Sequence, residues 1–187
     1  MSRINNVCVI GDGGWGTTLA ILLARKGANV SLWGAFPDYI EQVKGKRENL
    51  KFLPGVKIPE AVEITASMDE ALKGKDMVVL AVPSQYMRGI VDMLKMHDIA
   101  GKAFVSVTKG IETKTLERMS EVIGEVLAGA PLAVMSGPTI ALEVANGIPT
   151  TIVASSKDEA LARETQDIFM TERFRVYTNQ DVIGVEL

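Results

Sequence analysis

Three glycines near the start of the chain have the spacing of a phosphate-binding turn. Gly11, Gly13 and Gly16 fit the pattern G-x-G-x-x-G within the segment GDGGWG. In such a turn the first glycine allows a tight bend, the second lets the backbone approach a pyrophosphate, and the third lets a helix pack closely on a strand. The N–H groups at the start of the helix then face the anion. Because the turn follows a predicted strand and opens a predicted helix, it predicts dinucleotide binding.

The residues after the second predicted strand bear on the choice between NAD and NADP. In many dinucleotide-binding folds an Asp or Glu about 20 residues past the glycines holds the ribose 2′-hydroxyl of NAD. This region of the chain reads Trp33, Gly34, Ala35 and Phe36. With no carboxylate there to repel a 2′-phosphate, the sequence mildly favours NADPH. A nearby basic cluster is either a solvated surface or a contact for that phosphate, with Arg47 the candidate; its members are Lys44, Lys46, Arg47 and Lys51.

The elements that must position this turn follow from the hydrophobic pattern. Short apolar runs alternate with longer segments of helical periodicity, which is typical of βα units. The predicted strands are residues 7–10, 29–33, 77–82, 103–107, 132–135, 151–154 and 174–177, and the predicted helices are residues 15–26, 68–72, 84–96, 115–127 and 158–169. In the helix predicted at 115–127, Thr115 is placed to cap the start and Leu116 to open the apolar face.

This alternation predicts an α/β fold with a doubly wound, mainly parallel sheet and helices on both faces. Residues 45–59 have the least regular pattern and are expected to form a long excursion between the second and third βα units. No repeat, low-complexity tract or Pro/Gly/Ser linker divides the sequence, so a single domain is expected.

Composition disfavours several classes of function. The 187 residues are 47% hydrophobic and 23% charged, and a net charge of −3 supplies no positive field for nucleic acid or anionic lipid.

The single cysteine, Cys8, lies in a predicted strand and is expected to be a buried structural residue. The single histidine, His97, is expected at the surface near a helix end. Nine methionines are expected mainly in the core, and no cluster has metal-ligand spacing. With no targeting or transmembrane segment, we expect a cytoplasmic protein.

Seven segments, taken in order, resemble those of the bacterial NAD(P)-dependent glycerol-3-phosphate dehydrogenases. They are GDGGWGTTLA (11–20), LPG (53–55), AVPS (81–84), TKGIE (108–112), SGPTIALEVANGIPT (136–150), FRVYTN (174–179) and DVIGVEL (181–187). The resemblance implies a Rossmann-like domain and an oxidoreductase. Its reaction would be hydride transfer between NAD(P)H and dihydroxyacetone phosphate, giving sn-glycerol 3-phosphate for phospholipid synthesis. It also implies a small-molecule substrate, no nucleic-acid or membrane partner, and a homodimer for the full-length enzyme.

The resemblance also assigns roles to individual residues. Together with the residues discussed above, the candidate cofactor contacts are Gly11, Gly13, Gly14, Trp15, Gly16, Arg47, Pro83, Lys109 and Ala141, and the substrate contacts are Lys109, Gly137 and Thr139. The TKG and SGPT segments follow predicted strands, at ends where open α/β sheets bind ligands. An ammonium and backbone N–H groups suit a phosphate dianion. Lys109 taken alone could also be a solvated loop lysine, and Glu143 is either a cleft carboxylate or an early-helix residue.

The chain departs from the family pattern at three places. Asp12 and Gly14 stand where the turn often has Ala and Ser, and Ala35 lies near a position where relatives often carry a basic residue. The family also continues past GVEL with a segment that carries the catalytic lysine, its general acid/base, followed by a helical substrate domain. We therefore expect residues 1–187 to be the dinucleotide-binding domain, with 181–187 beginning the connecting helix. The catalytic lysine would lie beyond Leu187, so the chain would be inactive alone.

Two other functions fit part of the sequence. A cofactor domain of another hydroxy-acid dehydrogenase would also open with glycines after the first strand, but the KGIE and SGPT segments argue against it. A non-catalytic NAD(P)-binding redox sensor would fit a lone Rossmann domain, but it leaves Lys109 and SGPT without a role.

Overall fold

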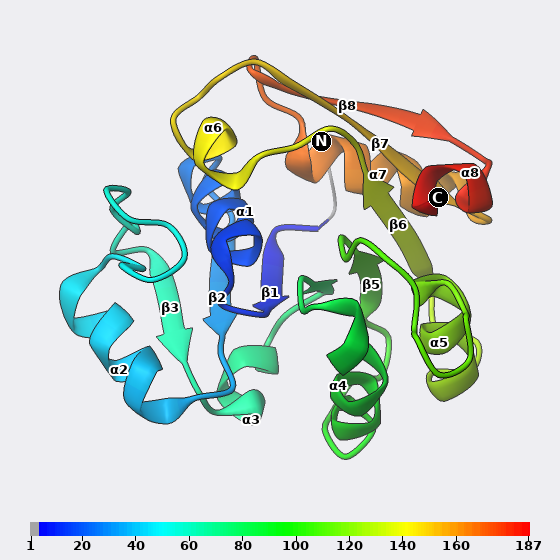
Figure 1. The fold of residues 1–187 in the computed structure, drawn as a ribbon, viewed down its shortest axis with the longest axis horizontal. Helices are drawn as coiled ribbons and strands as arrows, with labels where there is room; N and C mark the ends of the chain where they lie inside the picture. Colours follow the sequence, from blue (N-terminus) through cyan, green and yellow to red (C-terminus); the bar gives the residue numbers. More distant parts are fainter. Residues whose placement is uncertain (1–3) are drawn as a thin grey trace.

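One eight-stranded sheet forms the centre of the molecule. The computed structural model describes residues 4–187, and the strand order is β3-β2-β1-β4-β5-β6-β7-β8. Figure 1 shows β3 and β8 at opposite ends of this sheet. The strands are β1 (Asn6–Ile10), β2 (Asn29–Trp33), β3 (Val62–Thr65), β4 (Met77–Leu80), β5 (Ala103–Ser106), β6 (Leu132–Ser136), β7 (Thr150–Ser156) and β8 (Phe174–Asn179). All neighbouring pairs are parallel except β6 and β7, which confirms the predicted mainly parallel sheet.

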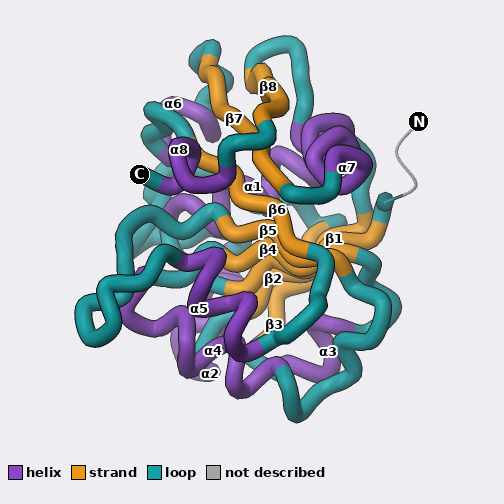
Figure 2. The backbone as a smooth tube through the Cα atoms, turned by 90° about the vertical axis from the view of Figure 1, so that its right-hand side faces the viewer, coloured by secondary structure: helices purple, strands orange, loops and turns teal. Residues whose placement is uncertain are grey.

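Helices cover both faces of the sheet, as the sequence predicts, and Figure 2 shows them on either side of the strands. They are α1 (Gly14–Arg25), α2 (Pro37–Lys46), α3 (Met68–Leu72), α4 (Met87–Leu94), α5 (Met119–Val126), α6 (Ala141–Ala145), α7 (Glu159–Phe169) and α8 (Val182–Glu186), with a 3₁₀ turn, η1 (Ser84–Tyr86), before α4.

Strand β1 shows how the sequence builds a core on each face. Val7 and Val9 belong to a hydrophobic cluster that includes side chains of α1, α2, α6 and α7. Cys8 and Ile10 point to the other face, into a cluster with side chains of α3, α4 and α5. These four side chains are fully buried, so consecutive apolar residues are explained by two covered faces. Burial also raises the pKa of the Cys8 thiol to about 12, which suits the predicted structural role.

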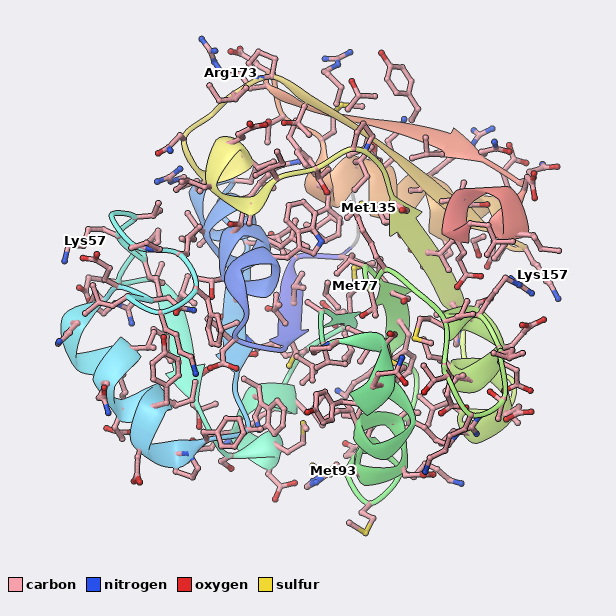
Figure 3. All side chains as sticks on the ribbon, in the orientation of Figure 1. Lys57, Met77, Met93, Met135, Lys157 and Arg173 are labelled. Carbon is pink, nitrogen blue, oxygen red and sulfur yellow. The ribbon has the colours of Figure 1, made fainter. Side chains whose placement is uncertain are left out.

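Buried methionines and exposed lysines illustrate the contrast between the interior and the surface of the fold. In Figure 3, Met77 and Met135 lie within the fold, whereas Lys57 and Lys157 project at its edge. Met77 and Met135 are almost completely buried, on β4 and β6. These two residues have the core-packing role expected of the methionines.

Three elements were not predicted, and each has a weak pattern. Strand β3 has only four residues, one of which, Glu63, is exposed. Helix α2 buries just Ile40 and Val43, and α6 is a single short turn of five residues. Their apolar periodicity is too brief to be distinguished from a loop.

The prediction for the start of α5 was wrong. The helix begins at Met119, and Leu116 lies in the preceding loop with φ of +63° and an exposure of 72%. Thr115 donates a hydrogen bond to the Glu112 carboxylate (2.7 Å) and does not cap the helix. Tertiary contacts of Glu112 therefore override the local helical pattern of this segment.

Strand direction gathers four loops at one edge of the sheet. Strands β1, β4, β5 and β6 run parallel in adjacent positions, so their carboxyl ends lie together. The segments that leave those ends are the glycine turn, residues 81–84, residues 107–110 and residues 137–139. In doubly wound sheets this edge is where ligands bind.

Candidate functional site

Steric reasons require glycine at Gly11 and Gly16 in the turn after β1. Gly11 has φ of +115°, and an added Cβ would lie 2.6 Å from the carbonyl oxygen of Ala81. A Cβ at Gly16 would overlap the carbonyl oxygen of Gly11. The bend and the close approach of α1 to the strand therefore depend on these two residues.

Gly13 differs because an added Cβ would meet nothing within 4 Å. It is the N-cap residue of α1, and no side chain caps the N-terminus of this twelve-residue helix. The positive end of the helix dipole is thus open beside a backbone that carries no side chain. This combination of free approach and uncapped N–H groups can hold a phosphate group.

The turn also brings Gly14 next to Ala141, two residues that the family resemblance assigns to the cofactor site. A Cβ at Gly14 would lie 3.6 Å from the Ala141 Cβ and 2.6 Å from the Phe52 carbonyl oxygen. The Thr18 hydroxyl of α1 donates to the Ala141 carbonyl oxygen (3.1 Å), which fixes α6 against α1. The segments around residues 14, 52 and 141 are therefore in direct contact.

Asn49 anchors the glycine turn, although no sequence pattern points to it. This residue is fully buried, and its Nδ2 donates to the Asp12 carbonyl oxygen (2.7 Å) and to the Thr17 hydroxyl (2.8 Å). The Tyr39 hydroxyl donates to its Oδ1 (2.5 Å). The irregular segment between α2 and β3 thus supports the glycine turn through the Asn49 side chain. A single asparagine within a charged loop carries no sequence signal for this role.

The Asp12 carboxyl group lies at the end of β2. The Gly11 N–H donates to the Trp33 carbonyl oxygen (2.9 Å), which places the turn beside this strand. A Cβ at Gly34 would lie 2.7 Å from the Asp12 Cγ and 2.9 Å from its Oδ2. The residues at the end of β2 carry no carboxylate, as the sequence indicates, but the turn brings one to this region from a distant position in the sequence.

On the neighbouring loops, Lys109 meets the two residues predicted to share its substrate site. Its Nζ donates to the Gly137 carbonyl oxygen (2.8 Å) and lies 3.4 Å from the Thr139 hydroxyl. The Thr108 hydroxyl donates to the Val82 carbonyl oxygen (2.7 Å), which ties this loop to the segment after β4. Within residues 4–187, Lys109 makes no ion pair, so its positive charge faces only neutral oxygens.

Arg88 of α4 holds the loop that carries Lys109. Its guanidinium forms a bidentate pair with Glu112 (2.8 and 2.9 Å) and further ion pairs with Glu117 (3.0 Å) and Glu125 (2.9 Å). The Arg88 hydrogen bonds lower the pKa of Glu112 to about 2. Glu112 is the last residue of the TKGIE segment, so its ion pair with Arg88 fixes the position of this loop against α4.

The other predicted cofactor contacts are placed less directly. Pro83 follows β4 and precedes η1, on the same edge as the glycine turn. Trp15 lies in the first turn of α1, where its ring packs near Phe174 with centroids 6.3 Å apart. Arg47 donates to the carbonyl oxygens of residues 58, 59 and 62, so its guanidinium closes the loop between α2 and β3. These bonds give Arg47 a structural role that the sequence did not predict.

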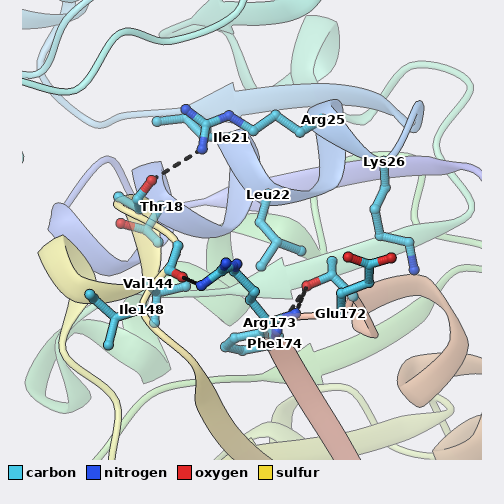
Figure 4. Close-up of a pocket in the computed structure, with 13 residues that line it drawn as sticks. Thr18, Ile21, Leu22, Arg25, Lys26, Val144, Ile148, Glu172, Arg173 and Phe174 are labelled. Atoms are coloured by element: carbon cyan, nitrogen blue, oxygen red, sulfur yellow. Dashed lines mark hydrogen bonds between the residues drawn. The ribbon is translucent and has the colours of Figure 1, made fainter.

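A cavity of about 370 Å³ lies between α1, α6 and the start of β8. Figure 4 shows Leu22, Phe174, Arg25 and Arg173 among the residues that line it. Both arginines donate to backbone carbonyl oxygens, Arg25 to Ala145 (3.1 Å) and Arg173 to Gly147 (3.4 Å). Its cations are thus already engaged, and the glycine turn does not line it.

Other side chains that could do chemistry lie outside this edge. His97 follows α4, and its Nδ1 lies 2.6 Å from an Asp69 oxygen. Among the described residues, no group of three or more His, Cys, Asp or Glu could hold a metal ion. No helix in the described part of the chain is long and apolar enough to cross a membrane.

Comparisons with known proteins agree with this arrangement. The family model of the NAD-dependent glycerol-3-phosphate dehydrogenase N-terminus matches residues 6–162. The glycerol-3-phosphate dehydrogenase [NAD(P)+] of Chlorobium limicola is 46% identical over 185 residues, which cover 97% of this chain and 56% of that protein. The crystal structure of the glycerol-3-phosphate dehydrogenase of Coxiella burnetii superposes with a TM-score of 0.93 at 32% identity, covering 98% of this chain and 56% of that one. The chain thus spans little more than half the length of these relatives.

Proposed function

We propose that this chain, which belongs to the family of NAD-dependent glycerol-3-phosphate dehydrogenases, is the dinucleotide-binding part of an enzyme that interconverts dihydroxyacetone phosphate and sn-glycerol 3-phosphate. The observation that carries the proposal is the open face of Gly13 at the uncapped N-terminus of α1. A packing role alone would account for Gly11 and Gly16 but leaves Gly13 unexplained.

The residues present fit a dinucleotide. Backbone N–H groups of the first turn of α1 would hold its pyrophosphate, because this helix start has no side-chain acceptor of its own. Gly14 and Ala141, which lie side by side, would form the adjoining wall. When bound, NAD(P)H supplies the hydride for the reduction.

Lys109, Gly137 and Thr139 would receive the phosphorylated substrate. Among the described residues, the partners of the Lys109 ammonium are all neutral. Its charge can therefore stabilise a dianion or the negative charge that develops on a carbonyl oxygen. Arg88 of α4 would keep this lysine in place by binding Glu112, which lies in the same loop as Lys109. The geometry therefore supports a binding and orienting role for Lys109.

We place no general acid among these residues. The family likeness assigns that role to a lysine that follows the GVEL segment in relatives, together with a helical substrate domain. In this proposal residues 1–187 form the dinucleotide-binding domain, and 181–187 begin the connecting helix. Ile183 of α8 is 54% exposed, which agrees with a helix whose apolar side packs on a further segment.

The broader biological context is part of the same proposal. The family likeness supports a role in supplying glycerol 3-phosphate for phospholipid synthesis, a cytoplasmic location and a homodimeric enzyme. The sequence favours NADP over NAD because no acidic residue follows β2, with the basic cluster around Arg47 as a candidate contact for the 2′-phosphate. The position of the Asp12 carboxyl removes the first of these reasons.

Two measurements test the proposal. Calorimetric titration of the 187-residue chain with NADH and with NADPH should show binding of at least one of them. NADH and NADPH oxidation with dihydroxyacetone phosphate should be measured on the full-length natural protein and on the 187-residue chain. Turnover is expected only for the full-length protein. Absence of binding of both nucleotides would refute the proposed function, and full turnover by the 187-residue chain would refute the assignment of the acid/base outside it.

A further inference from the structure

The Asp12 side chain occupies the place where an acidic residue usually contacts the cofactor ribose. In dinucleotide-binding folds that residue comes from the end of the second strand. Here β2 ends at Trp33 and is followed by Gly34, which has no side chain. The Asp12 carboxyl instead leans over Gly34 from the glycine turn, within 3 Å of where a Gly34 Cβ would be.

Within the described part of the chain, one oxygen of this carboxyl lacks the hydrogen-bond partner that buried polar atoms normally have. Its Oδ2 is buried, and none of the described residues forms a hydrogen bond with it. Leaving a buried acceptor unpaired is unfavourable, so such a group is expected to receive a donor from a ligand. A ribose offers two hydroxyl donors.

Nearby charges do not turn this region into a 2′-phosphate site. Lys51 is the cation that acts on Asp12, and its Nζ lies 5.0 Å from the centre of the Phe52 ring. Lys44 pairs with Glu41 (3.8 Å), and the Arg47 guanidinium donates to backbone carbonyls. Two members of the basic cluster are thus engaged elsewhere, whereas Oδ2 of Asp12 has no hydrogen-bond partner among residues 4–187.

Gly34 is what allows Asp12 to adopt this position. A Cβ at residue 34 would collide with the Ile40 side chain on one side and with the Asp12 carboxyl on the other. The absence of a side chain after β2, which first suggested an NADPH site, is the space that the Asp12 carboxyl fills.

We propose that Asp12 determines the choice between NAD and NADP, an inference that rests on the proposed dinucleotide site. Its carboxylate accepts hydrogen bonds from the adenosine ribose hydroxyls of NAD and repels the 2′-phosphate of NADP. The chain is therefore selective for NAD(H).

The test measures binding of ADP-ribose and 2′-phospho-ADP-ribose, which differ only at the 2′ position, to the full-length natural protein by calorimetry. The wild type should bind ADP-ribose about 10- to 100-fold more tightly, the range expected for hydrogen bonds to a charged group. Asp12→Asn and Asp12→Ala should each reduce this ratio at least about tenfold. Gly34→Ala, which displaces the carboxyl, should reduce it as well. Glu41→Gln is the matched control, because it removes one exposed carboxylate nearby and should leave the ratio unchanged.

The outcomes separate this inference from the proposed function. If neither ligand binds the wild type, the dinucleotide site itself is wrong. If both bind but the phosphorylated form binds equally or more tightly, Asp12 does not select NAD. An unchanged ratio in folded Asp12→Asn and Asp12→Ala proteins would also overturn the inference.

Discussion

Substitutions at Gly13 and Gly16 should separate ligand binding from fold stability within one turn. The Gly13 backbone has φ of −65° and ψ of 173°, which any residue can adopt, and a Cβ there has open space. Gly13→Val should therefore cost only about 1 kcal/mol, through a poorer helix N-cap. Gly16→Ala would drive a Cβ into the Gly11 carbonyl oxygen, and this backbone clash should cost about 3 kcal/mol.

Gly13→Val should mainly weaken NADH binding, whereas Gly16→Ala should mainly lower the melting temperature. For a domain of this size, 1 kcal/mol corresponds to a shift in Tm of about 2–4 °C, so Gly13→Val should lose a few degrees and Gly16→Ala roughly 6–12 °C. Binding of NADH should fall about 100-fold or more in Gly13→Val, because two charge-assisted hydrogen bonds to a pyrophosphate contribute about 3–6 kcal/mol.

Melting by circular dichroism and calorimetric titration measure both quantities on the same samples. The matched control is Gly124→Ala, since Gly124 lies in α5 with open space at its Cβ and should gain about 0.5–1 kcal/mol. Wild-type NADH affinity in a folded Gly13→Val protein would refute the placement of the pyrophosphate. A Gly16→Ala protein as stable as the wild type would refute the packing argument.

Three further predictions concern the loop edge and the core. The pKa of Glu112 is lowered from 4.5 to about 2, so its stabilising contribution is complete above about pH 4.5 and is lost as the pH falls towards 2. Glu112→Gln should flatten the dependence of Tm on pH over that range, and an unchanged acid profile would contradict this. Lys109→Gln in the full-length enzyme should weaken dihydroxyacetone phosphate binding by about 10- to 100-fold in steady-state kinetics, with Lys157→Gln as an unaffected control. Cys8 should resist alkylation at pH 8 until the protein is unfolded, because burial raises the pKa of its thiol to about 12; rapid labelling of the native protein, followed by mass spectrometry, would count against it.

The sequence was informative wherever a residue acts through its own type and local spacing. The glycine turn and the bounds of β2 and α3 followed from pattern alone. Strand β3 was missed because it has only four residues, and helix α2 because it buries only two side chains; so short an apolar pattern is ambiguous. The start of α5 was misplaced because Glu112 binds Arg88 and Thr115, a contact across 24 residues that no local pattern contains.

The site showed the same division between local and distant information. Lys109, Gly137 and Thr139 were predicted as one group, and the structure brings them into contact. Asn49 was not predicted because its partners lie 32 and 37 residues away along the chain. Asp12 was read only as an unusual residue in the turn, since its proximity to Gly34 arises from the pairing of β1 with β2.

The shared space of Asp12 and Gly34 also constrains the order in which this protein can acquire mutations. A side chain at residue 34 and a carboxyl at residue 12 compete for the same volume. A change of residue 34 made first would displace the carboxyl or strain the turn, whereas a change of Asp12 made first leaves only the end of the Ile40 side chain to move in the second step. Evolution towards a larger residue after β2, including a basic one, therefore has an accessible route that begins at residue 12.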